Sequence, residues 1–367
     1  MRILTVCAAV FLAFAAIAAG QAPIGAPGQT QRYLYMSTPD AAQGIYKSGL
    51  PGILVFDIDD GHKFVRRIPV PEFKEGLRGF TPNLKTHSAF FSLTSRRVGS
   101  FDLESEKMIW DKVFEAGADR SSVTPDGKKI YMPTGFWYLG EDGGMLVADA
   151  TNGDVIKRVI VGPAAHNSLV SLDGRFVYLG SQTTFTVYDT KDEKVIRQFK
   201  DVGERAIFPF TVDSKNRYAY ICLGNNVGFD MLDLETGKVI TRIYAGKEKI
   251  PHRTHGAALT PDETELWISD QQGQTLFVYD NTKIPPTPKA EVTGLSIKGH
   301  GWVTFSLDGK YAYSHAPEVF EATTKKLVTI LKDENGVPVS GSKFFEVHFR
   351  DGKVVEMGSE FGVGRKP

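Results

Sequence analysis

The 367-residue sequence lacks several features that define common protein classes. It has only two cysteines, and Cys7 lies in the apolar N-terminal segment, so Cys222 alone is expected in the mature chain and an intramolecular disulfide is excluded. Acidic and basic residues balance at 43 each, which leaves no overall field that would attract nucleic acid or an anionic membrane. No segment shows sustained helical periodicity. We therefore expect a core built from strands and held together by packing alone.

Short catalytic motifs are also missing. The sequence contains no His-Glu-x-x-His, no paired Cys-x-x-Cys and no Cys-x-x-Cys-His, so neither a helical zinc site nor covalent haem is indicated. It contains no Gly-x-Ser-x-Gly nucleophile turn and no glycine loop of the kind that binds phosphates. The sequence therefore leaves open whether the protein is an enzyme.

The one long apolar run lies at the N-terminus. Arg2 supplies a positive charge, and Ile3–Ala19 is almost wholly apolar and is followed by small residues. This pattern predicts a signal peptide over residues 1–20 and a flexible lead-in over residues 21–31. The apolar run is about 17 residues long, the lower limit for crossing a bilayer, so an uncleaved anchor is the alternative. We expect export to the periplasm or the cell exterior, with no membrane insertion of the mature chain.

Two short patterns recur along the whole chain. The first is an alternating apolar and polar segment that ends in an acidic residue before a turn, and successive copies lie 40 to 47 residues apart. Its acidic residues are Asp57, Asp102, Asp149, Asp189, Asp233, Asp280 and, in a degenerate copy, Glu321. The second pattern is a turn that resembles Ser/Thr-Pro-Asp-Gly, and its copies begin at Thr81, Thr124, Ser171, Thr211, Thr260, Ser306 and Phe349.

Each repeat reads as four strands of period two with short turns between them. Four antiparallel strands every 40 to 47 residues predict a propeller blade, and the seven copies predict a single all-β domain over residues 32–367, a seven-bladed β-propeller. The N-terminal unit lacks an inner strand, and residues 342–349 near the C-terminus supply one, so we expect the two ends to join in one blade. Residues 353–361 compete with residues 32–38 for a place in that blade.

The repeat resembles the YVTN-type seven-bladed propeller family, which is WD40-like, over almost all of the mature chain. The resemblance rests on the Ser/Thr-Pro-Asp-Gly turn, an aromatic-led strand and an Asp-rich turn. The literal Tyr-Val-Thr-Asn is absent, and its counterparts read Tyr-Met-Pro-Thr from Tyr131, Tyr-Leu-Gly-Ser from Tyr178 and Trp-Ile-Ser-Asp from Trp267. The resemblance implies the architecture and no single activity.

The long loops predict which face of the propeller carries the function. We name the strands of a blade a to d from the centre outward, so that the a–b and c–d turns share one face and the b–c loops and d–a crossings share the other. The a–b turns are tight, whereas the b–c loops at residues 133–144 and 38–52 are long, and residues 281–299 are predicted to form a long d–a crossing. Because binding resides on long loops of rigid scaffolds, we expect the site on the b–c face.

Polar residues stand at the start of every predicted inner strand on that face. They are mostly basic, and all seven blades would direct one toward the same mouth of the channel. The candidate binding residues are Arg78, Asp119, Arg120, His166, Arg205, His252, His255, His300 and Lys343.

Three interpretations fit this ring. In the first, the side chains only bond to neighbouring backbone around a wet channel. In the second, Arg78, Arg120, Arg205 and Lys343 bind a carboxylate or phosphate through charge-assisted hydrogen bonds. In the third, a divalent transition metal binds His166, His255 and His300, with Asp119 or His252 as a further ligand.

Two functional hypotheses follow. The first is an exported binding or scaffold module, expected to be a monomer, that engages a small anionic molecule or another exported protein at the mouth lined by histidine and arginine. The second is a metal-assisted enzyme, such as a lyase, lactonase or oxidase, that uses the same histidines. The aromatic run Phe136–Tyr138 is expected to pin its loop, Trp302 to serve as core or channel wall, and Cys222 to be a buried, inert thiol.

Overall fold

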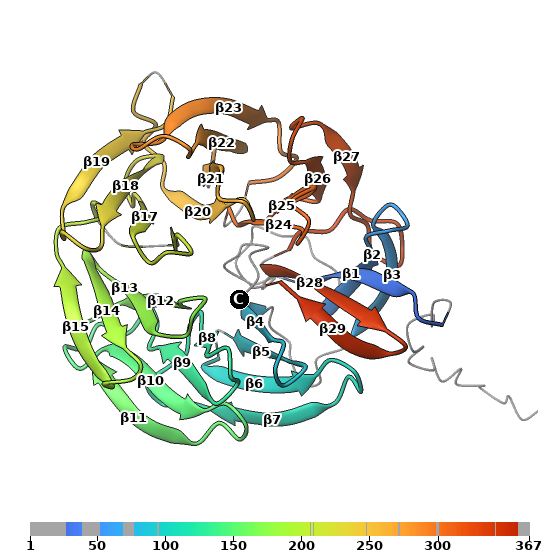
Figure 1. The fold of residues 1–367 in the computed structure, drawn as a ribbon, viewed down its shortest axis with the longest axis horizontal. Coiled ribbons are helices and arrows are strands. Elements are labelled where there is room, and N and C mark those ends of the chain that lie inside the picture. Colours follow the sequence, from blue (N-terminus) through green and yellow to red (C-terminus); the bar gives the residue numbers. More distant parts are fainter. Residues whose placement is uncertain are drawn as a thin grey trace, which may run out of the picture.

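The protein is a ring of seven antiparallel sheets around a central axis (Figure 1). This computed structural model describes residues 27–38, 52–68, 77–93, 95–205, 207, 209–246, 248–270, 272–298, 301–341 and 343–358. Within these ranges the regular structure consists of 29 strands, and none of it is a helix that could cross a membrane. The predicted all-β, seven-bladed propeller is confirmed. The predicted signal peptide lies outside the described residues.

The strands of the first three blades follow the chain without interruption. They are β4 (Leu77–Asn83), β5 (Ser88–Leu93), β6 (Arg97–Asp102) and β7 (Met108–Val113) in blade one, β8 (Ser122–Val123), β9 (Lys129–Pro133), β10 (Gly144–Asp149) and β11 (Val155–Ile160) in blade two, and β12 (Ala165–Val170), β13 (Phe176–Ser181), β14 (Thr184–Asp189) and β15 (Lys194–Phe199) in blade three. In each blade the four strands are hydrogen-bonded in chain order.

The next three blades repeat this order. They are β16 (Phe210–Val212), β17 (Tyr218–Cys222), β18 (Gly228–Asp233) and β19 (Val239–Tyr244) in blade four, β20 (Thr254–Leu259), β21 (Glu265–Asp270), β22 (Thr275–Asp280) and β23 (Thr287–Thr293) in blade five, and β24 (Val303–Phe305), β25 (Tyr311–Ser314), β26 (Glu318–Glu321) and β27 (Leu327–Ile330) in blade six.

The core lies between the blades. The inner three strands of a blade are buried on both faces, whereas outer strands such as β7 and β11 are largely exposed. One buried cluster joins Tyr131 and Val147 of blade two to Val177 and Leu179 of blade three, and similar clusters join other neighbouring blades. Each blade therefore stabilises its neighbours by burying apolar surface.

The Ser/Thr-Pro-Asp-Gly repeat has a local physical cause. In blade two, Thr124 Oγ1 donates to Asp126 Oδ1 at 2.6 Å and accepts from the backbone N–H of Lys129 at 3.1 Å. Gly127 adopts a φ of 70°, which favours glycine. The same two side-chain bonds recur at Ser171, Thr260 and Ser306, so each copy closes the tight turn between strands a and b.

Blades one and four depart from this prediction. The predicted turns began at Thr81 and Thr211, but both residues lie inside the inner strands β4 and β16. In blade four Asp213 takes the role of the hydroxyl residue, because its Oδ1 accepts from the backbone N–H groups of Arg217 and Tyr218. These turns therefore start two residues later than the repeat suggested.

The acidic residue of the other repeat caps the turn between strands c and d. Asp189 Oδ1 accepts from the backbone N–H groups of Lys191 and Asp192, both at 2.9 Å. Equivalent bonds to backbone N–H groups two or three residues downstream are made by Asp57, Asp102, Asp149, Asp233 and Asp280. The recurring aspartate is therefore explained by turn formation.

The two ends of the chain meet in blade seven, as predicted. Its sheet has the order β29 (Lys353–Met357), β28 (Lys343–Arg350), β1 (Thr30–Ser37), β2 (Ile53–Asp57) and β3 (Lys63–Ile68). Figure 1 shows β28, coloured red, beside β1, coloured blue. This blade has five strands instead of the predicted four, so both competing segments are accommodated.

The fifth strand is explained by the turn after β28. The segment "FRDG" was predicted to join strands a and b, but strand b of this blade is β1, at the other end of the chain. Asp351 and Gly352 instead form a two-residue turn with φ values of 50° and 74°, the conformation of a tight hairpin. The hairpin folds β29 back onto the free edge of β28.

The predicted long crossing at residues 281–299 is wrong. It contains β23, the outer strand of blade five, so the crossing toward blade six begins only after Thr293. The strand was missed because most of its side chains face solvent and Pro288 interrupts the pattern. The predicted b–c loop of blade two is present between β9 and β10, whereas residues 39–51 of the other loop lie outside the described residues.

A buried ion network reinforces the closing blade. The carboxylate of Glu346 on β28 is 1% exposed and accepts from Arg32 Nε on β1 at 2.9 Å. Glu346 also accepts from the backbone N–H of Leu307 at 2.7 Å, and its Oε1 lies 2.6 Å from His348 Nε2. One side chain thus links the first strand, the last blade and the turn of blade six.

Replacing Glu346 with Gln should lower the free energy of unfolding by about 2 kcal/mol, because the partly buried Arg32 loses the most buried of its three charged acceptors. Chemical denaturation would measure the change. The exposed Glu141→Gln is the matched control and should change stability by less than about 0.5 kcal/mol. Equal effects of the two variants would show that the network does not stabilise ring closure.

Cys222 should not react with a soluble thiol reagent in the native protein. It ends β17 and is fully buried, so the reagent cannot reach the sulfur. Burial also raises the pKa of Cys222 well above the ordinary value, so the reactive thiolate does not form. Labelling of a chain without residues 1–20 should reach one thiol per molecule only after denaturation. Fast labelling of the folded protein would contradict this burial.

Candidate functional site

A cavity of about 500 Å³ opens at the b–c mouth of the channel. Its lining comes from blades one to five and from the long loop of blade two. The lining residues are Arg78, Arg120, Phe136, Leu139, Ala164, His166, Gln182, Arg205, Ile207, Arg253 and His255. Five of the nine predicted site residues are therefore brought together in one cavity.

Arginine dominates the charge of this cavity. Arg78 and Arg120 come from blades one and two, and Arg205 and Arg253 precede the inner strands of blades four and five. Among the described residues that line the cavity there is no carboxylate. The lining therefore presents four permanent positive charges to whatever enters.

Asp119 and His166 form a buried pair behind the arginines. His166 Nδ1 lies 2.6 Å from Asp119 Oδ2, and His166 Nε2 lies 3.2 Å from Arg120 Nη1. A guanidinium can only donate, so His166 Nε2 accepts and its Nδ1–H donates to Asp119. Asp119 is also approached by Arg78 Nη1 at 3.8 Å from Oδ1. The histidine thereby positions the carboxylate between two arginines.

The pKa values of this pair follow from burial and charge. Burial, together with the nearby Arg120, lowers the pKa of His166 to about 4, despite the opposing attraction of Asp119. Burial alone would raise the pKa of Asp119, but His166, Arg78 and Arg120 outweigh it and hold the pKa at about 2. At neutral pH His166 is therefore a neutral hydrogen-bond donor and Asp119 a carboxylate.

The aromatic loop holds Arg78 in place. The guanidinium carbon of Arg78 lies 5.0 Å from the ring centre of Phe136 and 5.1 Å from that of Trp137. Trp137 packs on the backbone of Gly117 and Gly135, which explains part of the predicted pinning. Phe136 remains 45% exposed and lines the cavity, so it offers an apolar wall beside the cation.

Trp302 is buried between two cations. Its ring lies 3.8 Å from Lys343 Nζ of blade seven and 5.2 Å from the guanidinium carbon of Arg120. Lys343 is 1% exposed, so the structure does not bring this predicted site residue into the described lining of the cavity. Of the two predicted roles for Trp302, the structure supports the core role, because the side chain is 4% exposed, belongs to a buried cluster and does not line the cavity.

Arg253 was missed by the sequence analysis. It lies between His252 and His255 in the stretch Pro251–Glu263, of which only the two histidines were predicted to be site residues. Burial and the neighbouring charge of Arg205 lower the pKa of Arg253 from its ordinary value. Two arginines from different blades are thus close enough to repel each other at the cavity.

His252 and His300 do not join this lining in the described structure. His252 Nδ1 lies 3.1 Å from Asp270 Oδ1, outside the cavity, and His300 lies outside the described residues. His255 is 2% exposed, and its ring centre lies 6.3 Å from that of His166. The described residues contain no group of three or more His, Cys, Asp or Glu side chains arranged to hold a metal.

The chemistry of His166 also disfavours its predicted role as a metal ligand. A metal would need the lone pair of Nε2, which already faces the guanidinium of Arg120. A cation would also meet the repulsion of four arginines. The same groups favour an anion.

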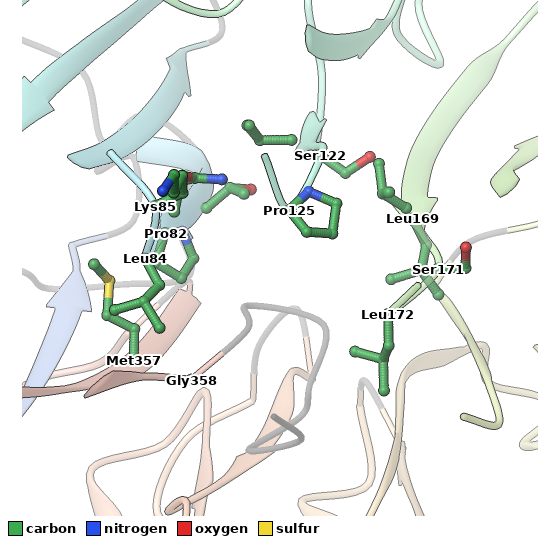
Figure 2. A pocket seen from close by; sticks show the side chains of 14 residues that line it. Pro82, Leu84, Lys85, Ser122, Pro125, Leu169, Ser171, Leu172, Met357 and Gly358 are labelled. Carbon is green, nitrogen blue, oxygen red and sulfur yellow. The ribbon is translucent and has the colours of Figure 1, made fainter. Parts of the chain in front are cut away.

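The opposite mouth of the channel has a different character. A pocket of about 260 Å³ lies beside the a–b turns. Figure 2 shows its lining, to which Pro82, Leu84, Pro125, Leu172 and Met357 contribute apolar side chains. Lys85 is the one charged residue in this lining among those described. The charged and the apolar mouths therefore lie on opposite faces, and the candidate site is the charged one.

Comparison with known proteins supports the fold alone. The structure resembles hydrazine synthase of Kuenenia stuttgartiensis with a TM-score of 0.60 and 16% identity, covering 79% of this chain and 98% of that one. It also resembles the Cps50 (Swd1) β-propeller domain of Myceliophteria thermophila with a TM-score of 0.56 and 9% identity, covering 78% and 97%. No protein-family model and no curated protein matches the sequence. The chain is a seven-bladed β-propeller, and the YVTN-type resemblance stays a prediction.

The neutral His166 should make stability depend on pH. Between pH about 6.5 and about 4, His166 is protonated in the unfolded chain but stays neutral in the native protein. The free energy of unfolding therefore falls as the pH falls. His166→Gln should flatten this slope, by ~3 kcal/mol at most across the interval. Denaturation at several pH values would measure it.

Native His62 and His315 have the same lowered pKa of about 4, so part of the slope should persist in the His166→Gln variant. An unchanged slope would show that His166 is not held neutral in the native protein.

Proposed function

We propose that this propeller is an exported binding module whose b–c mouth captures a small anionic molecule. The observation that carries the proposal is the convergence of four arginines, from four different blades, on one cavity whose described lining lacks a carboxylate. The volume of about 500 Å³ lies in the range of small-molecule sites. Charge-assisted hydrogen bonds from guanidinium groups to carboxylate or phosphate supply the binding chemistry.

The network behind the cavity supports this assignment. His166 accepts from Arg120, Asp119 offsets part of the charge of Arg120, and the aromatic loop positions Arg78. Such supporting contacts hold the donors in place before a ligand arrives, which reduces the entropy lost on binding. A site built only for folding would have no need of this many cations around open space.

Export and family membership belong to the same proposal. Export rests on the charged and apolar N-terminal segment of residues 1–20, and membership of the YVTN-type family rests on the recurring turns. Another exported protein is the alternative ligand, because propeller faces with long loops also suit protein partners. We expect the small molecule, since the cationic groups are recessed in a cavity.

Arg78→Gln should weaken binding of a small carboxylate or phosphate by about tenfold or more, because one charge-assisted contact is lost. Isothermal titration of the tag-free protein with citrate and with inorganic phosphate would measure the affinity at fixed ionic strength. Lys215→Gln makes the same charge change on the opposite face and should have little effect. Failure of every anion to bind the wild type would refute the proposed function.

The metal-assisted enzyme remains the competing hypothesis, and elemental analysis separates it. Near-stoichiometric metal in the tag-free protein, lost in a His255→Ala/His300→Ala variant, would favour that hypothesis over the anion module. We expect anion binding to be unchanged by added zinc, copper or iron, since the arginines need no metal to bind an anion.

A further inference from the structure

The four arginines of the cavity form two pairs, and this arrangement deepens the proposed function, on which the inference rests. Arg78 and Arg120 belong to neighbouring blades one and two, and both approach Asp119. Arg205 and Arg253 belong to neighbouring blades four and five. Figure 1 places β4 and β8 across the channel from β20, which directly follows Arg253. The two pairs therefore approach the cavity from different sides.

Each pair is accompanied by one histidine of the lining. His166 of blade three contacts Arg120, and His255 follows Arg253 by two residues. The ring centres of these two histidines are 6.3 Å apart. A ligand with one carboxylate has a single anionic group for the two pairs, whereas a ligand with two anionic groups can offer one to each pair.

The two pairs also differ in their electrostatic surroundings. Asp119 offsets part of the charge of Arg78 and Arg120. Burial and, after it, the neighbouring charge of Arg205 lower the pKa of Arg253, so an added negative charge there would be favourable. Phe136, Leu139 and Ile207 add apolar surface to the same lining. The cavity thus combines two pairs of cations with apolar side chains.

From this geometry we propose that the ligand is a small molecule with two separated anionic groups, carboxylate or phosphate, joined by a short apolar body. One group binds Arg78 and Arg120, and the other binds Arg205 and Arg253. Gln182, at the turn between β13 and β14, lines the same cavity and supplies a neutral polar contact to the body of the ligand.

The first test compares ligands of similar size and different charge. Glutarate and 3-phosphonopropionate carry an anionic group at each end, whereas monomethyl glutarate has lost one of them. Titration at fixed ionic strength should show that both doubly charged molecules bind about tenfold or more tightly than the monoester. The tighter of the two shows which anionic group the site prefers. Equal affinities for all three would overturn the two-point site while leaving a general anion site standing.

The second test removes one pair. An Arg205→Gln/Arg253→Gln variant should bind glutarate as weakly as the wild type binds the monoester, and its affinity for the monoester should change less than about threefold because the other pair remains. A Lys85→Gln/Lys215→Gln variant, which loses two charges on the opposite face, is the matched control and should keep the advantage of glutarate. An equal loss for glutarate and the monoester would overturn the assignment.

The outcomes also separate the inference from the proposed function. If no anion binds to the folded wild type, both fail. If the monoester binds and glutarate has no advantage, only the two-point inference fails. Thermal unfolding of each variant without ligand would verify that it is folded before its affinity is compared.

Discussion

The pairing of β1 with β28 is the constraint on which the rest of the structure depends. It joins residues such as Tyr33 and Val347, which are separated by nearly the whole chain, and it turns a row of blades into a closed ring. Closure covers the sheet faces that the first and the last blade of an open row would expose. It also fixes the spacing of the inner strands around the axis. The cavity at the b–c mouth exists because five such strands are held at set positions around one axis.

The parts of the fold that were predictable from sequence are those with a local cause. Thr124 with Asp126, and Asp189 with its following backbone amides, form turns whose chemistry is complete within a few residues, so the repeat could be read directly. Strand β23 was missed because it is an outer strand with little burial, and β29 because the Asp351–Gly352 turn looked like all the others. The burial of β23 and the strand that β29 pairs with depend on the whole fold, so the local sequence does not determine either of them.

The candidate site was predictable in part for the same reason. The position of Arg78, Arg120 and His166 at the starts of inner strands could be counted from the repeat, and this predicted their shared mouth. The closeness of Arg205 to Arg253 depends on the packing of two blades, and the burial of Lys343 under Trp302 depends on a third. The orientation of His166 by Asp119 likewise required coordinates, since residue spacing carries no information about ring nitrogens.

The dominance of arginine at the mouth has a kinetic consequence. Guanidinium groups stay charged over the physiological pH range, and His166 is already neutral above a pH of about 4, so neither group changes the positive field of the cavity near neutral pH. Such a field accelerates the diffusional approach of anions, and dissolved salt weakens it over a distance of about 8 to 10 Å. The rate at which this protein meets its ligand would therefore follow the ionic strength of its surroundings much more closely than their pH.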